Sequence, residues 1–281
     1  MTPFKNSAKL CHIDVERGID LIVKPPLRRA AIEAITVIGS GGYEAVFLNL
    51  PRSLQPYIPK LAEEGDVEAF MEEAKEATQL PENYLKALLR GHETFFKLLP
   101  RVSSGREIIC YSPNPTHEEI RATLELPALI LRDTITETIS LERWLSLIEE
   151  MIESTKNKLR EEAAYLLTET RRFRHSACIC NPEAAVNLKK HLQKKAPTHI
   201  IYTALPYAYT PLQILLRLYQ QKPVPASQAE KHIKQHLKFI QKHVIPQGLD
   251  QAIENWTTQQ LKWLTDDPQK HQTKPQTTHE T

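Results

Sequence analysis

Apolar residues recur every three or four positions along most of the chain, which is the spacing of helices that bury one face. The pattern predicts helices over residues 27–38, 66–78, 81–99, from 116 onward, 140–174, 182–195, 210–219, 227–244 and 247–264. The longest, 140–174, carries an apolar stripe that begins with Leu141 and Trp144. Thr116 and Glu119 have the spacing of a capping box, and Asp66 is placed as an N-cap. The chain is therefore predicted to be mostly helical.

Short apolar runs between these helices predict strands. They cover residues 10–15, 43–50, 106–111 and 198–203, while 126–131 fits either a strand or a helix. The residues between the first strand and the first helix, including Pro25 and Pro26, are expected to form a loop. The continuous apolar run at 45–48 is typical of a strand that is buried on both faces. The predicted class is α/β and predominantly helical, with a short, mainly parallel sheet flanked by long helices.

The apolar pattern stops near the C-terminus. Residues 266–281 are mostly Gln, Thr, Lys, His and Pro, and such a segment buries too little apolar surface to offset the entropy of ordering. We expect a single α/β domain over residues 1–265, helical in its C-terminal part, followed by a disordered tail over 266–281.

Charge and composition narrow the class of partner. Lys and Arg total 36 and Asp and Glu total 34, a balance that argues against a nucleic-acid-binding protein. The N-terminus lacks the apolar core of a signal peptide, and no apolar run approaches the ~20 residues that span a bilayer. Four scattered cysteines do not make a disulfide framework. We expect a cytoplasmic protein that does not bind a membrane.

Three motifs have a chemical and a structural interpretation. The glycines at 39–42 lack the G-x-G-x-x-G pattern and precede a strand, so we interpret them as the end of a helix. His175, Cys178 and Cys180 are an incomplete zinc set, so we predict buried thiols, no metal and no cofactor. The acid–base pair His92 and Glu93 lies inside a predicted helix, where a solvated face is the simpler interpretation.

Polar residues follow three of the predicted strands. At the end of the strand at 43–50 these are Asn49 and Arg52; at the end of 106–111, Tyr111, Ser112 and Asn114; and at the end of 198–203, Tyr202, Thr203, Tyr207 and Tyr209. The carboxyl ends of parallel strands share one edge of the sheet, where α/β proteins bind ligands. The alternative is that these residues only form turns. We predict a ligand site made of Asn49, Arg52, Tyr111, Arg132 and Tyr207, in which the two arginines clamp a carboxylate or phosphate. No catalytic residue is assigned.

The order of segments resembles a known superfamily. A helix leading into Tyr43-Glu-Ala-Val-Phe-Leu-Asn-Leu-Pro51 is similar to the early motif of TraB-type proteins, in the wider group with ChaN and erythromycin esterase-like proteins. The helix from Asn181-Pro-Glu-Ala-Ala185, the strand at 198–203 and the helix from Pro211 resemble the closing segment of that group. The resemblance spans residues 10 to 222 and implies a relative of hydrolases with a site at the strand ends.

Two departures bear on what the resemblance implies. Asn49 stands where the family has an acidic residue, and Leu205-Pro-Tyr-Ala-Tyr209 replaces its Gly-x-x-His. Metal-dependent hydrolysis is therefore not expected. We expect a TraB-like protein that binds a small anionic ligand at the strand ends. The alternative is an interaction protein whose long helices dock a partner or a second copy. A shared pocket would favour the first, and an exposed apolar stripe on a long helix the second.

Overall fold

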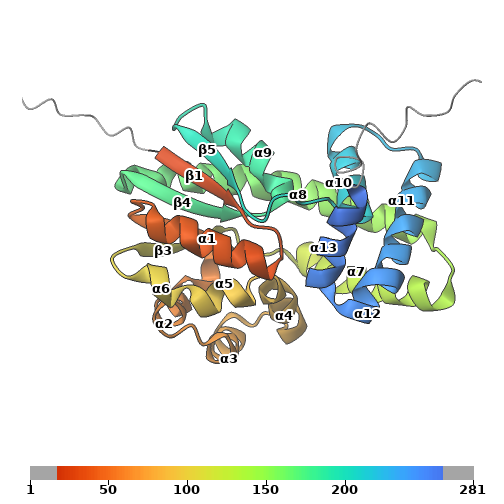
Figure 1. Ribbon diagram of the computed structural model, residues 1–281, viewed down its shortest axis with the longest axis horizontal. Coiled ribbons are helices and arrows are strands. Elements are labelled where there is room, and N and C mark those ends of the chain that lie inside the picture. Colours follow the sequence, from red (N-terminus) through yellow and green to blue (C-terminus); the bar gives the residue numbers. More distant parts are fainter. Residues whose placement is uncertain (1–17, 262–281) are drawn as a thin grey trace, which may run out of the picture.

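The computed structural model describes residues 18–261 and places a five-stranded sheet at one end of the molecule (Figure 1). The strands are β1 (Gly18–Val23), β2 (Ala45–Pro51), β3 (Glu107–Ser112), β4 (His175–Cys180) and β5 (Thr198–Tyr202). Their order is β3-β2-β4-β1-β5, and every neighbouring pair is parallel. The predicted class, predominantly helical α/β with a parallel sheet, is confirmed. The predicted strand at 10–15 and the predicted tail at 266–281 lie outside the described residues.

Two of the five strands were not predicted. The expectation of a loop before Pro25 is wrong, because Gly18–Val23 is the strand β1 and is buried on both faces. The run of apolar residues in β1 is interrupted by Asp20, whose carboxylate accepts a hydrogen bond from the Tyr43 hydroxyl at 2.8 Å. The second is β4, which contains His175, Cys178 and Cys180, the residues that we interpreted as an incomplete zinc set. Cys178 and Cys180 are fully buried in the middle of the sheet, as expected of core thiols.

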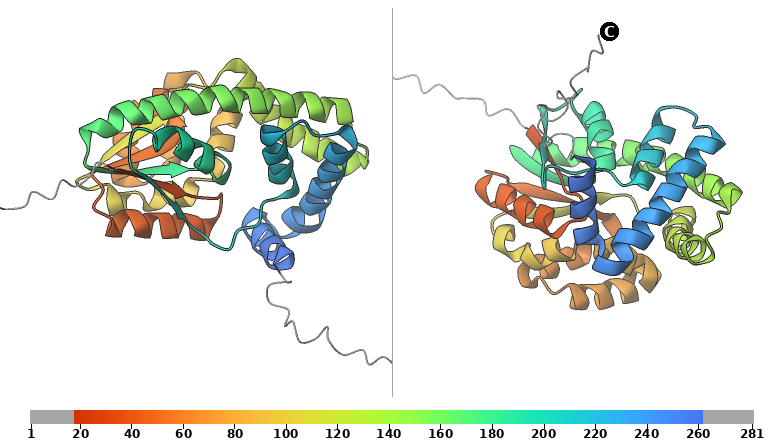
Figure 2. Two further views of the ribbon diagram at one scale, coloured as in Figure 1. Left: turned by 90° about the horizontal axis from the view of Figure 1, so that it is seen from above. Right: turned by 45° about the vertical axis from the view of Figure 1, so that its right-hand side comes forward.

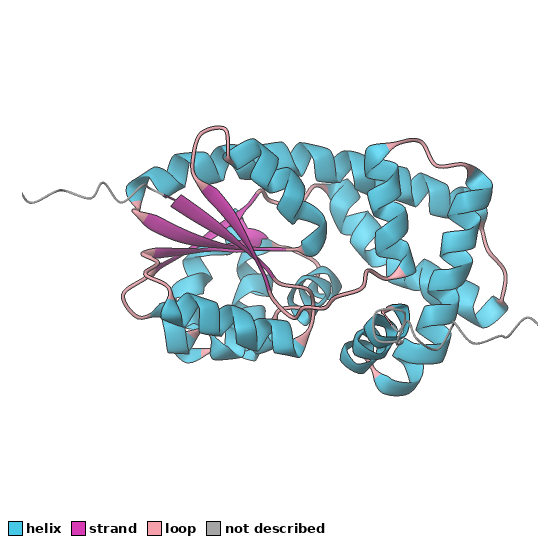
Figure 3. Cartoon of the chain, turned by 45° about the horizontal axis from the view of Figure 1, so that its top comes forward, coloured by secondary structure: helices cyan, strands magenta, loops and turns pink. Residues whose placement is uncertain are grey.

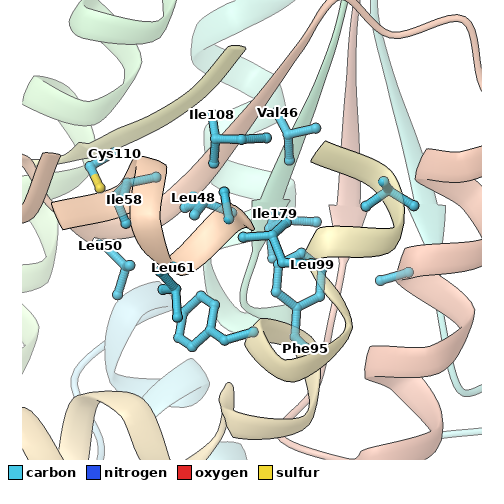
Figure 4. Close-up of a cluster of buried hydrophobic side chains, with 14 of the residues drawn as sticks. Val46, Leu48, Leu50, Ile58, Leu61, Phe95, Leu99, Ile108, Cys110 and Ile179 are labelled. Atoms are coloured by element: carbon cyan, nitrogen blue, oxygen red, sulfur yellow. The ribbon is translucent and has the colours of Figure 1, made fainter. Parts of the chain in front are cut away.

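One face of the sheet packs against α1 (Arg28–Ser40) and the segment between β2 and β3. That segment forms η1 (Arg52–Tyr57), α2 (Ile58–Glu64), α3 (Val67–Thr78), α4 (Glu82–Arg90), α5 (Glu93–Leu98) and α6 (Pro100–Ser103). The helix predicted over 81–99 is thus divided at Gly91 and His92. Figure 4 shows the core between these layers, where Val46, Leu48 and Ile108 of the strands meet Leu61 and Phe95 of the helices.

The other face packs against α8 (Leu141–Glu169) and α9 (Pro182–Leu192), and η2 (Thr170–Arg172) follows α8. The long α8 also runs into a helical part at the opposite end of the molecule (Figure 2). Its residues Leu159, Ala163 and Leu166 pack on the sheet, whereas Trp144 and Ile148 pack in the helical part. A single helix therefore contributes both to the core on this face of the sheet and to the core of the helical part.

The helical part contains α7 (His117–Thr136), α10 (Pro211–Gln221), α11 (Ala226–Phe239), the π-helical turn η3 (Ile240–Val244), α12 (Ile245–Gln247) and α13 (Leu249–Gln260). In this part, α7, α10 and α11 pack against the first half of α8, whereas α13 packs near the start of α1 (Figure 3). Residues 126–131, which fitted either class, are helical within α7. None of the helices within 18–261 is apolar over a length that would cross a bilayer.

Candidate functional site

The connections after β2 and β4 leave the sheet on opposite faces. After β2 the chain continues into η1 and α2 on the α1 face, and after β4 it continues into α9 on the α8 face. Because β2 and β4 are neighbours, their carboxyl ends form a topological switch point. In open parallel sheets this is the place where a crevice forms and ligands bind.

A cavity of about 320 Å³ lies at this switch point. Its polar lining residues come from four elements: Asn49 from β2, Asn181 and Glu183 from the start of α9, Thr155, Lys158 and Glu162 from α8, and Gln220 from α10. Met151, Ile152, Leu159, Ala184 and Leu216 form the apolar wall. The volume is in the range of small-molecule sites, and most of the lining surface is apolar, which is usual for such sites.

A hydrogen-bonded network lies at the base of the cavity. The Ser112 hydroxyl, at the carboxyl end of β3, is within hydrogen-bond reach of Asn49 Oδ1 and of Glu162 Oε1. Glu162 is only 4% exposed. Burial raises the pKa of the Glu162 carboxyl, and the positive charge of Lys158 and the bond with Ser112 oppose that shift only in part. A buried carboxyl of raised pKa beside a cavity is a feature of functional sites.

Lys158 is the only cation in the described lining of this cavity. The same residue lines two adjoining hollows along α8, toward α7. Those hollows are strongly acidic, with Glu118, Glu119, Glu150, Glu153 and Glu161 among their lining residues. The cavity therefore has one positive charge at its border and a negative region next to it.

The structure does not bring the five predicted site residues together. Asn49 lines the cavity, but Tyr111 is fully buried in the core and donates a hydrogen bond to the Ile179 carbonyl at 3.1 Å. Tyr207, beyond β5, donates to Gln213 Oε1 at 3.0 Å and packs beside the C-terminal helices. Among the strand-end residues, Asn49 and Ser112 lie together, and Tyr207 packs against Tyr209 with 5.6 Å between the ring centroids. The Tyr209 hydroxyl donates to the Pro182 carbonyl at 3.3 Å, at the start of α9.

The two arginines lie near opposite ends of α8. Arg52 forms an ion pair with Glu161 and lies over the Tyr165 ring, 4.9 Å from its centroid. Arg132 bonds to Asp133 at 2.7 Å and to the hydroxyl of Ser140, the residue before α8. Ser140 and Glu161 are separated by about 20 residues of helix, roughly 30 Å at the rise of an α-helix. Arg52 and Arg132 therefore cannot clamp one small ligand together.

Sequence reasoning missed Glu162 and Lys158. Their signal is in the apolar stripe of α8, because Glu162 is three residues after Leu159 and four before Leu166. A carboxyl at such a buried helical position requires a polar partner, and the partner is Ser112 from a distant strand. Following the stripe beyond Ile152 would have identified Glu162 as a candidate.

Within residues 18–261, no group of three or more His, Cys, Asp or Glu side chains is arranged to hold a metal ion. No protein-family model, no curated protein and no solved structure matches the chain.

Proposed function

We propose that this protein binds a small ligand with one carboxylate group and an apolar body in the cavity between β2, β4 and α8. The observation that carries the proposal is the lining itself, in which a single lysine borders a mostly apolar cavity at the switch point of a parallel sheet. The ammonium group of Lys158 would attract the carboxylate, and the amides of Asn49 and Asn181 would supply neutral hydrogen bonds. Leu159, Ile152 and Leu216 would contact the apolar body.

The surrounding charge limits the ligand to one acidic group. Glu183 lies in the cavity wall, and Glu119 and Glu161 line the adjoining hollows. A polyphosphate or a dicarboxylate would bring further negative charge close to these carboxylates, which is unfavourable in a partly buried site. The described lining contains neither histidine nor cysteine, and the Ser112 hydroxyl is buried beneath it. We therefore propose binding rather than hydrolysis.

The test uses hexanoate as the probe, with isothermal titration of the full chain. Lys158→Ala should weaken hexanoate binding by roughly tenfold to a hundredfold, the usual range for losing a charged contact of about 1.5–3 kcal/mol. Lys156→Ala is the matched control, because Lys156 is an exposed lysine on the same helix that pairs with Glu153 at 3.7 Å and does not line the cavity. Equal affinities of the two variants would refute the proposal, as would the absence of binding to wild type.

A second candidate function is self-association through α7. Leu131 is 57% exposed and Ile135 is 72% exposed, and Ala128 is exposed one turn before them. Their spacing makes an apolar stripe on one face of the helix. This observation favours the alternative of an interaction protein, although the stripe is on α7 and not on α8 or the C-terminal helices. Light scattering coupled to size exclusion should show a dimer that Leu131→Ser with Ile135→Ser converts to a monomer.

A further inference from the structure

The network under the cavity has more hydrogen-bond acceptors than its hydroxyl can serve. Ser112 Oγ contacts Asn49 Oδ1 and Glu162 Oε1, and a serine hydroxyl carries one proton. Neither an amide oxygen nor a carboxylate oxygen can donate. Both contacts are therefore hydrogen bonds only if a second proton is present, and there are two places from which it can come.

In the first arrangement Glu162 is a carboxylic acid. Its proton is donated to Ser112 Oγ, and the Ser112 proton is donated to Asn49 Oδ1, so the Asn49 NH₂ group is left for the cavity. In the second arrangement Glu162 is a carboxylate that accepts the Ser112 proton. Ser112 Oγ then accepts from Asn49, whose amide is turned by 180° because its NH₂ group now faces the serine. Asn49 then leaves its carbonyl oxygen for the cavity.

We propose that the proton on Glu162, relayed through Ser112, determines whether Asn49 presents an N–H donor or a carbonyl acceptor to the ligand. The class of ligand that binds therefore depends on whether Glu162 is protonated. The acid form suits a carboxylate or another acceptor, and the ionised form suits an ammonium group or another donor. The geometry of the relay is independent of any ligand, but its consequence for the choice of ligand depends on the binding function proposed above.

The groups that face Glu162 indicate which of the two arrangements its surroundings favour. The charged neighbours are Lys158 and Glu161 on α8, Glu119 on α7 and Glu183 on α9. The titratable neighbours in the sheet are Tyr111 of β3 and Cys178 and Cys180 of β4. Burial raises the pKa of each of these three, so they remain neutral and offer Glu162 no compensating positive charge. Burial has the largest effect on the pKa of Glu162 and raises it, and the carboxylates of Glu119 and Glu161 add to this rise while Lys158 and the bond with Ser112 oppose it. These surroundings favour the acid form, which presents the N–H donor.

The first experiment tests the relay without a ligand. The Glu162 carboxyl carbon and the Asn49 side-chain amide are followed by NMR from about pH 3 to about pH 9, a range that covers the ordinary carboxyl pKa and any higher one up to about 9. The Asn49 amide signals should move with the same midpoint as Glu162 in wild type. In Ser112→Ala they should no longer follow it, and Ser112→Thr, which keeps the hydroxyl, should restore the coupling. Asn49 amide signals in wild type that do not change with the ionisation of Glu162 would overturn the relay.

The second experiment tests the consequence with two probes of the same length, hexanoate and hexylammonium. In wild type the affinity for hexanoate should fall by up to tenfold per pH unit above the Glu162 midpoint, while that for hexylammonium rises. Glu162→Gln, whose amide donates to Ser112 as the acid does, should bind hexanoate at all these pH values without the fall. If hexanoate affinity depends on pH in Ser112→Ala as it does in wild type, the fall is caused by direct repulsion between the Glu162 carboxylate and hexanoate, and the relay is refuted. Failure of hexanoate to bind at all would refute the proposed function, and the NMR result would still decide the relay.

Discussion

The ammonium group of Lys24 donates a hydrogen bond to the carbonyl oxygen of Gly91 at 2.8 Å, which ties the carboxyl end of β1 to the break between α4 and α5. Lys24 is only 1% exposed. No carboxylate within residues 18–261 lies within ion-pair distance of it. A Cβ atom at Gly91 would meet Pro26 Cβ at 3.1 Å, so a glycine permits this close approach of the backbone. The anchor therefore places an uncompensated amine in the core.

This anchor should make stability depend on alkaline pH. Burial lowers the pKa of Lys24 from its ordinary 10.5 to about 8. Between these values the unfolded chain binds the proton and the folded chain does not, so the contribution of Lys24 to stability rises with pH. Below about pH 8 both states are protonated and the folded state bears the full penalty, on the order of 3 kcal/mol. The free energy of unfolding of wild type, relative to Lys24→Met, should therefore increase by about that amount between about pH 7 and about pH 10.5.

Urea unfolding of both proteins at the two pH values measures this difference. Lys156→Met, on an exposed part of α8, controls for the loss of a lysine elsewhere. Lys24→Met also leaves the Gly91 carbonyl without its donor, which lowers stability by about 1–3 kcal/mol at both pH values and cancels in the comparison. A difference between wild type and Lys24→Met that stays constant with pH would contradict the prediction.

Asp133 should be a structural residue of the helical part, and Arg132 its partner. The fully buried Asp133 carboxylate accepts from Trp144 Nε1 at 2.8 Å, from the Ser140 backbone at 3.2 Å and from Arg132 at 2.7 Å. Burial alone would raise the pKa of Asp133, but these hydrogen bonds outweigh it and the pKa is lowered. Its contribution is therefore present above the ordinary aspartate pKa and is lost as pH falls through the lower folded value.

Asp133→Ala should lower the free energy of unfolding by about 3 kcal/mol, because the indole N–H loses its acceptor in the core. Arg132→Ala should cost less, about 1–2 kcal/mol, because the Arg132 side chain is partly exposed and Asp133 keeps its bonds to Trp144 and Ser140. Thermal unfolding at neutral pH compares the two. Should Arg132→Ala prove the more damaging, the ranking of the two residues would be wrong.

Gln55 closes one edge of the sheet. Its side-chain amide donates to the Ile108 carbonyl at 2.9 Å and accepts from the Cys110 backbone N–H at 2.6 Å, so it pairs with the edge strand β3 as a neighbouring strand would. An open edge strand invites pairing with other chains. Gln55→Met should cost about 1–3 kcal/mol through the unpaired backbone groups and should increase aggregation on heating. Light scattering compares it with Gln193→Met at an exposed helix end, and equal scattering would refute the role of Gln55.

Local chemistry explains which parts of the fold could be predicted. The capping box of Thr116 and Glu119 is present, and Asp66 caps α3 by accepting from the Ala69 backbone at 3.0 Å, because both signals involve residues three positions apart. By contrast, β1 contains Asp20, a residue that strands disfavour. Asp20 is accommodated by the Tyr43 hydroxyl and by His175 Nε2 at 3.1 Å, and β4 supplies that histidine from a distant part of the chain.

The residues of the candidate site likewise differ in whether a local signal or a tertiary contact places them. Asn49 and Ser112 were expected at the carboxyl edge because each ends a strand that the sequence predicts. Glu162 and Lys158 come from the middle of a helix, and their place over the β2 and β4 ends depends on how α8 crosses the sheet. The pairing of Arg52 with Glu161 is likewise a tertiary contact. Strand-end position alone therefore predicts the floor of the cavity and not its charged border.

Arg52 provides the last prediction, because sequence and structure suggest different roles for it. Its position after β2 favoured an anion ligand, whereas its guanidinium already pairs with Glu161 and lies over the Tyr165 ring. An arginine neutralised in this way attracts a second anion weakly, and the pair is partly exposed to solvent, which screens its charge further. We expect Arg52→Ala to lower hexanoate affinity by less than about twofold, far less than Lys158→Ala, and to cost under about 1 kcal/mol of stability. Isothermal titration of both variants and urea unfolding of Arg52→Ala provide the measurements. A tenfold loss of hexanoate affinity in Arg52→Ala, with its unfolding midpoint unchanged, would instead assign Arg52 to the site and place the carboxylate on the β2 side of the cavity.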